Sequence, residues 1–256
     1  MTSKPVGRVA WVTGGATGIG LAAAQALGAA GYSLVISGRR VAELDKAVQA
    51  LTADGIAAQA RPLDVSDAGS VQAAADAILA EHGRIDALVL SAGTNVPNRT
   101  WKNLTAEGFN KVAAINLNGV AYCVAAVLPA MRKAGAGSIV VVSSWAGWRF
   151  LPFTGAAYGA TKMALAPLVE SINYEEGHLG IRATLVCPGE VATPILRSRP
   201  VPPPDADIAR MLQPEDVGSA IAYAVTAPAR VCINELVIGP SWNRIYLGAD
   251  DLQTKR

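Results

Sequence analysis

Short runs rich in β-branched residues alternate with longer alanine-rich stretches along most of this chain, from its first residues to about Cys187. The short runs have the length and composition of buried strands, and the longer stretches have those of helices. Strands that alternate with helices form parallel sheets with helices on both faces, because each parallel connection must cross the sheet. The pattern therefore predicts an α/β fold with a doubly wound parallel sheet of about seven strands.

Seven runs are expected to be strands, and five stretches are expected to be helices. The expected strands are Val9 to Val12, Leu34 to Ser37, Ala57 to Pro62, Ala87 to Leu90, Ser138 to Val142, Ile181 to Val186 and Glu235 to Ile238. The expected helices are Ile19 to Ala30, Val41 to Ala53, Ser70 to His82, Val112 to Lys133 and Tyr158 to Glu176. No linker rich in Pro, Gly or Ser divides the chain before Pro200, so residues 1–256 are expected to form one domain.

The composition argues against several classes of partner. The formal net charge is only +2, and Lys and Arg do not cluster with aromatic residues, so no nucleic acid is expected to bind. Cys123, Cys187 and Cys232 are far apart without CxxC spacing, so neither a disulfide framework nor a metal site is expected. We interpret the cysteines as small buried residues in a reducing compartment, and His82 and His178 as surface residues without metal-ligand spacing.

The chain is expected to be cytoplasmic and not to enter a membrane. No cationic and apolar signal segment precedes the first expected strand at Val9. The uncharged run at residues 112–131 has the length of a membrane span, but polar residues interrupt it and Pro129 closes it. A helix buried in the core or in a subunit interface is the preferred interpretation.

The first expected strand runs directly into a series of glycines in which the first helix begins. Glycines permit a tight turn and let backbone N–H groups approach a pyrophosphate, and the helix N-terminus adds a partial positive charge. The GxxxGxG spacing also occurs in turns that bind no ligand, but its position after the first strand favours a Rossmann-type dinucleotide site. The residues expected to bind the cofactor here are Gly14, Thr17, Gly18, Ile19 and Gly20.

The end of the second expected strand bears on the choice between the two nicotinamide dinucleotides. An acidic residue at this position would hold the ribose 2′-hydroxyl of NAD, but this chain has Gly38 followed by Arg39 and Arg40. Arginine pairs with phosphate through bidentate, charge-assisted hydrogen bonds, so these residues predict NADP(H), with NAD(H) as the second choice. The alternative is that both arginines are solvated at the start of a helix, although the helix dipole disfavours a cation there.

Tyr158 and Lys162 are four residues apart in an expected helix, so their side chains share one face. A free phenol has a pKa of about 10, and a neighbouring cation favours the phenolate, which would let Tyr158 exchange a proton near neutral pH. Ser143 and Ser144 end the fifth expected strand, at the edge of the sheet where ligands bind. A single Tyr-x-x-x-Lys pair is common on protein surfaces, so the hypothesis depends on the combination of motifs.

The glycine series, the paired serines and the Tyr-x-x-x-Lys motif together resemble the short-chain dehydrogenase/reductase family over essentially the whole chain. The resemblance implies hydride transfer between a nicotinamide dinucleotide and a carbonyl or secondary alcohol, with Tyr158 as acid/base. It implies that Lys162 holds the nicotinamide ribose and tunes Tyr158, while Ser144, in Ser-x-Ala-Gly, hydrogen-bonds the substrate oxygen. Asn116 resembles the fourth residue of the family's catalytic set, after Tyr158, Lys162 and Ser144. In the family this residue positions a backbone carbonyl and a path of water molecules that leads to the lysine, here Lys162.

Further cofactor contacts follow from the same resemblance. Asp64, beside Val65, resembles the residue that meets the adenine amino group, and a Pro-Gly loop would hold the nicotinamide carboxamide. The remaining expected contacts are Ala92, Gly93, Pro188, Gly189, Val191 and Thr193. The family's Asn-Asn-Ala-Gly is Leu-Ser-Ala-Gly at residues 90–93, so contact there would rely on backbone groups. The spacing between the serine and tyrosine motifs is one residue longer than the family's commonest.

Aromatic residues crowd the stretch before Tyr158, namely Trp145, Trp148, Phe150 and Phe153. They either line a pocket for an apolar or aromatic substrate or pack a long loop onto the domain, and Trp101 and Trp242 can join either arrangement. The segment at about 194–213 is rich in proline and has few apolar anchors. By the family resemblance it is a short substrate-covering segment.

Two alternatives to a hydride-transfer enzyme share this fold. A halohydrin-lyase-like branch would have an arginine in place of Lys162 and would lack the dinucleotide loop. This chain has both Lys162 and the glycine series, so the sequence argues against that branch. A non-catalytic dinucleotide sensor would keep the loop but could lose Tyr158 or Ser144, which are both present. The uncharged run and the helix after Tyr158 expose much apolar surface, and the resemblance implies a homotetramer or homodimer.

Overall fold

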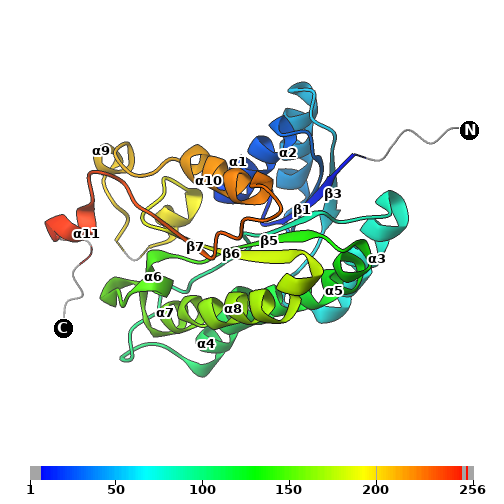
Figure 1. Cartoon of the computed structure of the whole chain (residues 1–256). Helices are drawn as coiled ribbons and strands as arrows, with labels where there is room; N and C mark the ends of the chain where they lie inside the picture. Colours follow the sequence, from blue (N-terminus) through cyan, green and yellow to red (C-terminus); the bar gives the residue numbers. More distant parts are fainter. Residues whose placement is uncertain (1–6, 200, 250–251, 253–256) are drawn as a thin grey trace, which may run out of the picture.

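The computed structural model describes residues 7–199, 201–249 and 252, and these fold around a seven-stranded sheet (Figure 1). The strands are β1 (Val9–Thr13), β2 (Ser33–Gly38), β3 (Ala58–Pro62), β4 (Ala87–Leu90), β5 (Gly137–Val142), β6 (Ile181–Pro188) and β7 (Glu235–Ile238). All neighbouring strands are parallel, in the order β3-β2-β1-β4-β5-β6-β7. The predicted doubly wound α/β fold of the Rossmann type is confirmed, and the ends of each expected strand agree within two residues.

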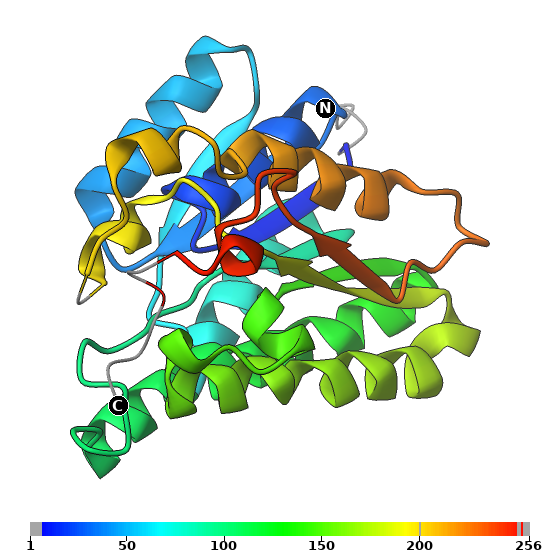
Figure 2. The same ribbon diagram turned by 90° about the vertical axis from the view of Figure 1, so that its left-hand side faces the viewer.

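Helices cover both faces of the sheet (Figure 1, Figure 2). One face carries α1 (Gly18–Ala29), α2 (Val41–Ala53) and α10 (Pro214–Thr226). The other face carries α3 (Ala68–His82), α4 (Ala106–Ala113), α5 (Gly119–Ala134), α7 (Ala156–Met163) and α8 (Leu165–Glu176). The connections that follow β5, β6 and β7 contain the short helices α6 (Trp145–Trp148), α9 (Asp205–Ile208) and α11 (Arg244–Leu247).

Alternate residues of each strand belong to opposite layers of the core. In β1, Val9 and Trp11 pack with the α3, α5 and α8 layer, whereas Ala10 and Val12 pack with the α1, α2 and α10 layer. Successive side chains of a strand point to opposite faces, and both faces of this sheet are covered. The strands are therefore continuous apolar runs instead of alternating apolar and polar residues.

Two expected helices are interrupted where they pass the site. The helix expected at 112–133 is instead α4, the π-helical segment Ala114–Asn118 and α5, and the helix expected at 158–176 is divided into α7 and α8 by a turn at Ala164. Single π-turns insert an extra residue into a helix and are often found at functional sites. Sequence analysis also missed α10, although Pro214 at its first position and a capping box signal its start.

The helical run Ala106–Ala134 is long and apolar enough to cross a membrane by length and composition alone. In the structure, however, α5 buries Val120, Cys123 and Val127 in the core layer that it shares with α3 and α8. It is therefore a core helix of the α/β fold, which agrees with the preferred interpretation.

The cysteines differ in their environment. Cys123 and Cys187 are buried free thiols, and burial raises the pKa of each to about 12. Cys232 is exposed, so the expectation that all three are buried was wrong for this residue. It lies in the connection from α10 to β7, and β7 is an edge strand with a neighbour on one side only.

Candidate active site

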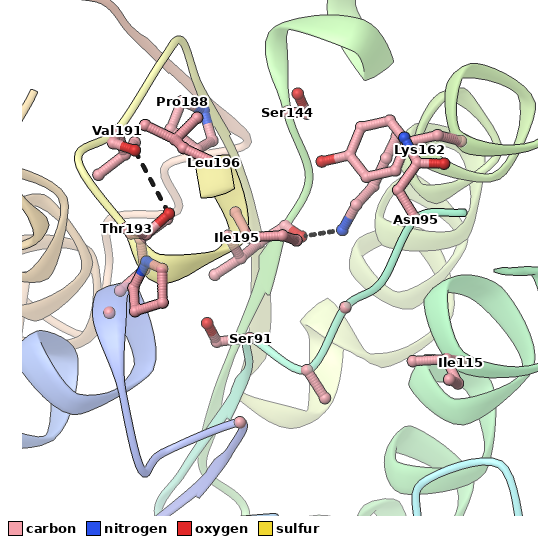
Figure 3. A pocket seen from close by; sticks show the side chains of 18 of the residues that line it. Ser91, Asn95, Ile115, Ser144, Lys162, Pro188, Val191, Thr193, Ile195 and Leu196 are labelled. Carbon is pink, nitrogen blue, oxygen red and sulfur yellow. Dashed lines mark hydrogen bonds between the residues drawn. The ribbon is translucent and has the colours of Figure 1, made fainter. Parts of the chain in front are cut away.

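The strand order of the sheet reverses between β1 and β4, so the connections that follow these strands leave toward different sides. Open α/β sheets bind ligands in the crevice that such a reversal opens at the carboxyl ends of the strands. A cavity of about 660 Å³ lies there, lined by residues that end or follow β1 to β7 (Figure 3). Every predicted site residue lines this cavity except Gly20 and Asn116.

The glycine loop between β1 and α1 adopts backbone conformations that other residues rarely take. Gly14 has φ +66° and Gly18 has φ +55°. A Cβ at Gly14 would lie 2.8 Å from the amide nitrogen of Ala92, and a Cβ at Gly18 would lie 3.0 Å from Cγ2 of Thr193. Gly20 lies outside the cavity lining and packs against the carbonyl of Gly14. A side chain at Gly20 would clash with that carbonyl, so the turn requires a glycine here.

The N-terminus of α1 is open to a ligand. Thr17 is the N-cap residue, but its side chain makes no capping hydrogen bond, and the first turn of α1 contains no acidic side chain. Unpaired N–H groups and the helix dipole at such a terminus favour an anion. The loop therefore fits the pyrophosphate of a dinucleotide, with Thr17, Gly18 and Ile19 in the cavity wall.

Residues that follow β2 and β3 form another part of the wall. Arg39 and Arg40 are exposed and line the cavity, and in the described part of the chain neither has a salt-bridge partner. Asp64 also lines the cavity with Val65. The pKa of Asp64 is lowered by hydrogen bonds from Ser66 and, to a smaller extent, by the charge of Arg39. The Asp64 carboxylate and the Arg39 guanidinium thus lie near each other in the part of the wall that follows β2 and β3.

The two serines at the end of β5 have different roles. Ser143 is buried, and its hydroxyl donates a hydrogen bond to the carbonyl oxygen of Lys162 at 3.0 Å. Ser144 lines the cavity with Tyr158, accepts a hydrogen bond from the amide of Ala146 at 3.1 Å, and acts to lower the pKa of the Tyr158 phenol. The structure therefore places Ser144, as predicted, beside Tyr158.

Tyr158 on α7 is half-buried in the cavity wall. Desolvation raises the pKa of its phenol above the ordinary value of 10.0. The hydrogen bond with Ser144 and the charges of Arg199 and Arg99 oppose this increase. Sequence analysis assigned that effect to Lys162, so the electrostatic environment of the phenol differs from the expectation.

Lys162 lies one turn after Tyr158 on α7 and is almost fully buried. Its Nζ donates a hydrogen bond to the carbonyl oxygen of Val142 at 2.7 Å (Figure 3). Its Nζ lies 5.8 Å from the centre of the Tyr158 ring. Desolvation lowers the pKa of the ammonium to about 8, because burial disfavours the charged form.

Asn116 acts on the backbone next to the cavity instead of lining it. It is fully buried in the π-helical segment. Its Oδ1 accepts a hydrogen bond from the amide of Thr94 at 2.8 Å, and its Nδ2 donates to the carbonyl of Thr94 at 3.0 Å. A Cβ at Gly93 would lie 3.7 Å from both Asn116 Oδ1 and Lys162 Nζ, so Asn116 shapes the chain beside Lys162.

Figure 3 shows two walls of the cavity that face each other, built from residues that end or follow β4, β5 and β6. Pro188, Val191 and Thr193 lie on one side, where Thr193 Oγ1 donates a hydrogen bond to the carbonyl of Val191 at 3.3 Å. Asn95 and Lys162 lie on the other side. The remaining predicted contacts, Ala92, Gly93 and Gly189, also line the cavity.

The aromatic residues before Tyr158 are divided between the two roles considered for them. Trp145 and Phe153 line the cavity. Trp148 and Phe150 are exposed, and so is Trp101. Trp242 is not in the cavity lining but stacks on Arg210, whose Cζ lies 3.9 Å from the ring centroid.

The segment at 194–213 is better anchored than expected. It contains the 3-10 helix Pro194–Ser198 and α9, and it buries Leu196, Met211 and Leu212. Its first residues, up to Arg199, contribute to the cavity wall. The first half of the segment therefore lies in the cavity wall, while its second half packs on the body of the protein.

Sequence analysis missed several lining residues that carry charge or amide groups, namely Asn95, Arg99, Glu190 and Arg199. Arg99 belongs to the connection after β4, whereas Glu190 and Arg199 follow β6. No local spacing links such distant segments. The only available signal was their position after parallel strands, which many other residues share.

A family model described as short chain dehydrogenase matches residues 8–201 of this sequence. The chain belongs to the short-chain dehydrogenase family. An uncharacterized oxidoreductase of Listeria monocytogenes is 32% identical over 241 residues, which cover 91% of this chain and 96% of the relative. The protein is thus a short-chain dehydrogenase/reductase and an oxidoreductase.

Solved structures of short-chain dehydrogenases have the same fold. An alcohol dehydrogenase from the archaeon Thermococcus sibiricus, complexed with 5-hydroxy-NADP, has a TM-score of 0.82 and 29% identity and covers 93% of this chain and 98% of its own. An actinorhodin polyketide ketoreductase variant with NADPH has a TM-score of 0.84 and 28% identity, with coverage of 93% and 97%. A nicotinamide dinucleotide is accordingly the cofactor of this short-chain dehydrogenase. The open α1 terminus and the crowded Gly14 turn fit its pyrophosphate.

The burial of Lys162 predicts a pH dependence of stability. Its pKa is about 8 in the folded protein against an ordinary value of 10.5, so between these values the unfolded chain binds more protons and a rise in pH stabilises the fold. From about pH 8 to about pH 9.5, the free energy of unfolding of the wild type should rise by about 1.5 kcal/mol relative to Lys162→Met. Urea unfolding of both proteins measures this, and a constant difference would contradict the buried ammonium.

Proposed function

We propose that this short-chain dehydrogenase transfers a hydride between NADP(H) and a carbonyl or secondary alcohol, with Tyr158 as the acid/base. The position of the Tyr158 and Ser144 side chains in the cavity that the glycine loop also lines carries this proposal. It gives one site a proton donor and a second hydroxyl for a substrate oxygen. Lys162 adds a cation one helical turn away.

The raised pKa of Tyr158 suits the reductive direction. When bound, the nicotinamide ring supplies or accepts the hydride. Tyr158 is protonated near neutral pH because burial raises the pKa of the phenol, so it can donate its proton to a carbonyl oxygen whose carbon receives the hydride. Ser144 can donate a second hydrogen bond to that oxygen, and the product is an alcohol. In the reverse direction Tyr158 accepts the proton.

Lys162 and Asn116 support this chemistry from beside the substrate. The ammonium of Lys162 keeps two of its three protons available after its bond to the Val142 carbonyl, so it can hold the ribose hydroxyls of the cofactor. Asn116 binds both backbone groups of Thr94 and so holds the chain that passes Lys162. Asn116 is therefore a positioning residue.

The end of β2 supports a preference for NADP(H) over NAD(H). Gly38, Arg39 and Arg40 line the cavity there. None of them is acidic, so none can accept a hydrogen bond from a ribose 2′-hydroxyl. Arg39 and Arg40 are free to pair with a 2′-phosphate. Arg39 is the stronger candidate because its charge already acts on Asp64 within the wall.

The walls near Tyr158 support a substrate with an apolar part. The apolar lining residues here are Trp145, Leu151, Phe153 and Ile245. Ligand pockets of this kind bury apolar surface and orient it with few polar groups. The halohydrin-lyase alternative is disfavoured by Lys162 and the intact glycine loop, and the sensor alternative by the presence of both Ser144 and Tyr158 in the cavity wall.

A homodimer or homotetramer is the proposed assembly, and the cytoplasm is the proposed location. The outer faces of α5 and α8 enclose a hollow of about 200 Å³, whose apolar members are Ala121, Val124, Ala125, Leu128, Leu168 and Ile172. An apolar hollow on two adjacent helices supports association of identical chains. Three free thiols fit a reducing compartment.

Removal of the Arg39 guanidinium should change the cofactor preference. Arg39→Ala is expected to weaken NADPH binding by about 1.5–3 kcal/mol, the value of a charge-assisted contact, and to leave NADH nearly unchanged. Fluorescence titration with both cofactors measures the two dissociation constants. Lys46→Ala removes an exposed cation from the same helix α2 and serves as the control. Equal losses for both cofactors, or a wild type that prefers NADH, would refute the role of Arg39.

Tyr158→Phe should remove nearly all turnover and leave NADPH affinity almost intact, because the ring still packs and only the hydroxyl is lost. Lys162→Ala should reduce both, since the ammonium also holds the ribose. The measurements are kcat across a pH range and NADPH affinity, with Tyr174→Phe on the surface of α8 as control. Activity above a few per cent in Tyr158→Phe throughout that range would show that Tyr158 is not the acid.

The association through α5 and α8 can be tested by light scattering at micromolar concentration. A dimer or tetramer is expected for the wild type. Ala125 is exposed in the isolated chain, so Ala125→Glu should leave the fold intact and shift the protein toward smaller species. A wild-type monomer, or an assembly that Ala125→Glu does not affect, counts against this interface.

A further inference from the structure

Two arginines line the cavity beside Tyr158 and have no part in cofactor binding as proposed above. Arg99 comes from the connection after β4, and Arg199 from the segment after β6. Both line the same cavity as Tyr158, and the charges of both act to lower the pKa of its phenol. Two cations at this position need a reason, because like charges repel and burial disfavours them.

Arg99 is held in place by the backbone around it. Its carbonyl oxygen accepts a hydrogen bond from the amide of Ala156 at 3.2 Å, and Nδ2 of Asn95 donates to the carbonyl of Thr154 at 2.9 Å. These bonds tie the loop to the segment just before Tyr158. Arg99 is therefore fixed relative to α7.

The guanidinium of Arg99 has free donors although the residue is only 9% exposed. Its Nε donates to the carbonyl of Val96 at 3.0 Å. Within the described residues, no carboxylate forms a salt bridge with Arg99, and its two terminal nitrogens have no hydrogen-bond partner. The pKa of Arg99 is lowered by desolvation and by the charge of Arg199, so the site holds this cation at a cost in stability. Such uncompensated charges are typical of functional sites.

Arg199 is only partly neutralised. Its Nη1 donates to Oε1 of Glu190 at 2.6 Å, and Glu190 also pairs with Arg244 at 3.2 Å, which in turn pairs with Asp207 at 2.9 Å. The Cζ of Arg199 lies 5.6 Å from the ring centroid of Phe153, so the guanidinium lies beside an apolar part of the wall. Of the charged residues Arg99, Arg199 and Glu190 that line this part of the cavity, two are cations and one is an anion. One negative charge would balance them.

We propose that Arg99 and Arg199 bind a carboxylate group of the substrate, so that the protein acts on a carbonyl compound or alcohol that also carries a carboxylate. This inference rests on the proposed hydride transfer at Tyr158. A carboxylate is the monoanion that matches one excess positive charge, and the planar fork of arginine donates two parallel hydrogen bonds to it. The apolar walls at Trp145 and Phe153 would hold the carbon chain between the two polar groups.

A different role for the two arginines makes a different prediction. If they served only to keep Tyr158 acidic, their loss would slow every substrate equally and would shift the pH profile of kcat. If they bind a carboxylate, their loss would affect charged substrates and spare neutral ones. A comparison of each acid with its own uncharged ester separates these roles.

The experiment compares matched carbonyl compounds with NADPH, using pyruvate, acetoacetate and levulinate, each beside its methyl ester. Dihydroxyacetone and its phosphate form an additional pair. Binding of benzoate and benzamide to the NADP-loaded protein is measured by calorimetry, so that the carboxylate is tested without turnover. The proteins are the wild type, Arg99→Gln, Arg199→Gln, Arg99→Lys and the control Arg197→Gln. Arg197 is exposed, lies outside the cavity and pairs with the exposed Asp205.

In the wild type, kcat/KM is expected to be higher for an acid than for its ester, and benzoate should bind more tightly than benzamide. Arg99→Gln and Arg199→Gln should each reduce kcat/KM for the acid by about 10- to 100-fold and leave the ester within about 2-fold, as expected for a lost charge-assisted hydrogen bond. Arg99→Lys should recover part of the loss. Arg197→Gln should behave as the wild type. NADPH affinity is the check that each variant is folded.

Three results would overturn the carboxylate site. They are a wild type that uses esters as well as acids and binds benzoate no better than benzamide, equal losses for acid and ester in the variants, and a preference confined to the phosphate. If no carbonyl compound is reduced at all, the proposed function fails instead. The benzoate titration of Arg99→Gln then still decides whether Arg99 binds a carboxylate.

Discussion

The contact between the loops that follow β1 and β4 is the constraint on which the rest of the site depends. Gly14 turns in the left-handed region, and the place of a Cβ at this residue is taken by the backbone of Ala92. This contact lies where the strand order reverses, so it determines how the N-terminus of α1 faces the cavity. The pyrophosphate site and the site of Tyr158 therefore share one cavity because two backbones meet without a side chain between them.

The site combines several groups that are costly to bury. Lys162 is a buried cation with a lowered pKa, Arg99 is a second cation with few partners, and Tyr158 is a half-buried phenol whose pKa is raised. These costs are offset by the two apolar layers that cover the sheet, where residues such as Val12 and Leu88 are fully buried. Charged groups in a poorly solvated cavity are screened less by water, so each electrostatic contact with a ligand is stronger than it would be in water. The apolar layers of the sheet thus support a site that holds several groups costly to bury.

The interruption of the α4–α5 run illustrates how local structure serves the site. A regular helix would bury apolar residues at fixed spacing, but the π-helical segment Ala114–Asn118 turns Asn116 into the core toward Thr94. A buried amide requires partners for its oxygen and nitrogen, and the two backbone groups of Thr94 provide them. The helix irregularity and the course of the chain beside Lys162 are therefore parts of one arrangement.

The sequence by itself determined the strands, the parallel fold, the glycine loop and the pair Tyr158 and Lys162, because these depend on local periodicity and on contacts between near neighbours. It also indicated Ser144, since the run that begins at this serine resembles the family's Ser-x-Ala-Gly. Only the tertiary structure gave Ser143 its buried bond to the Lys162 carbonyl, exposed Cys232, and brought Arg99 and Arg199 into the cavity with Tyr158. These features arise where segments far apart in the chain meet, and which residues meet there is decided by the packing of the whole sheet and its helices.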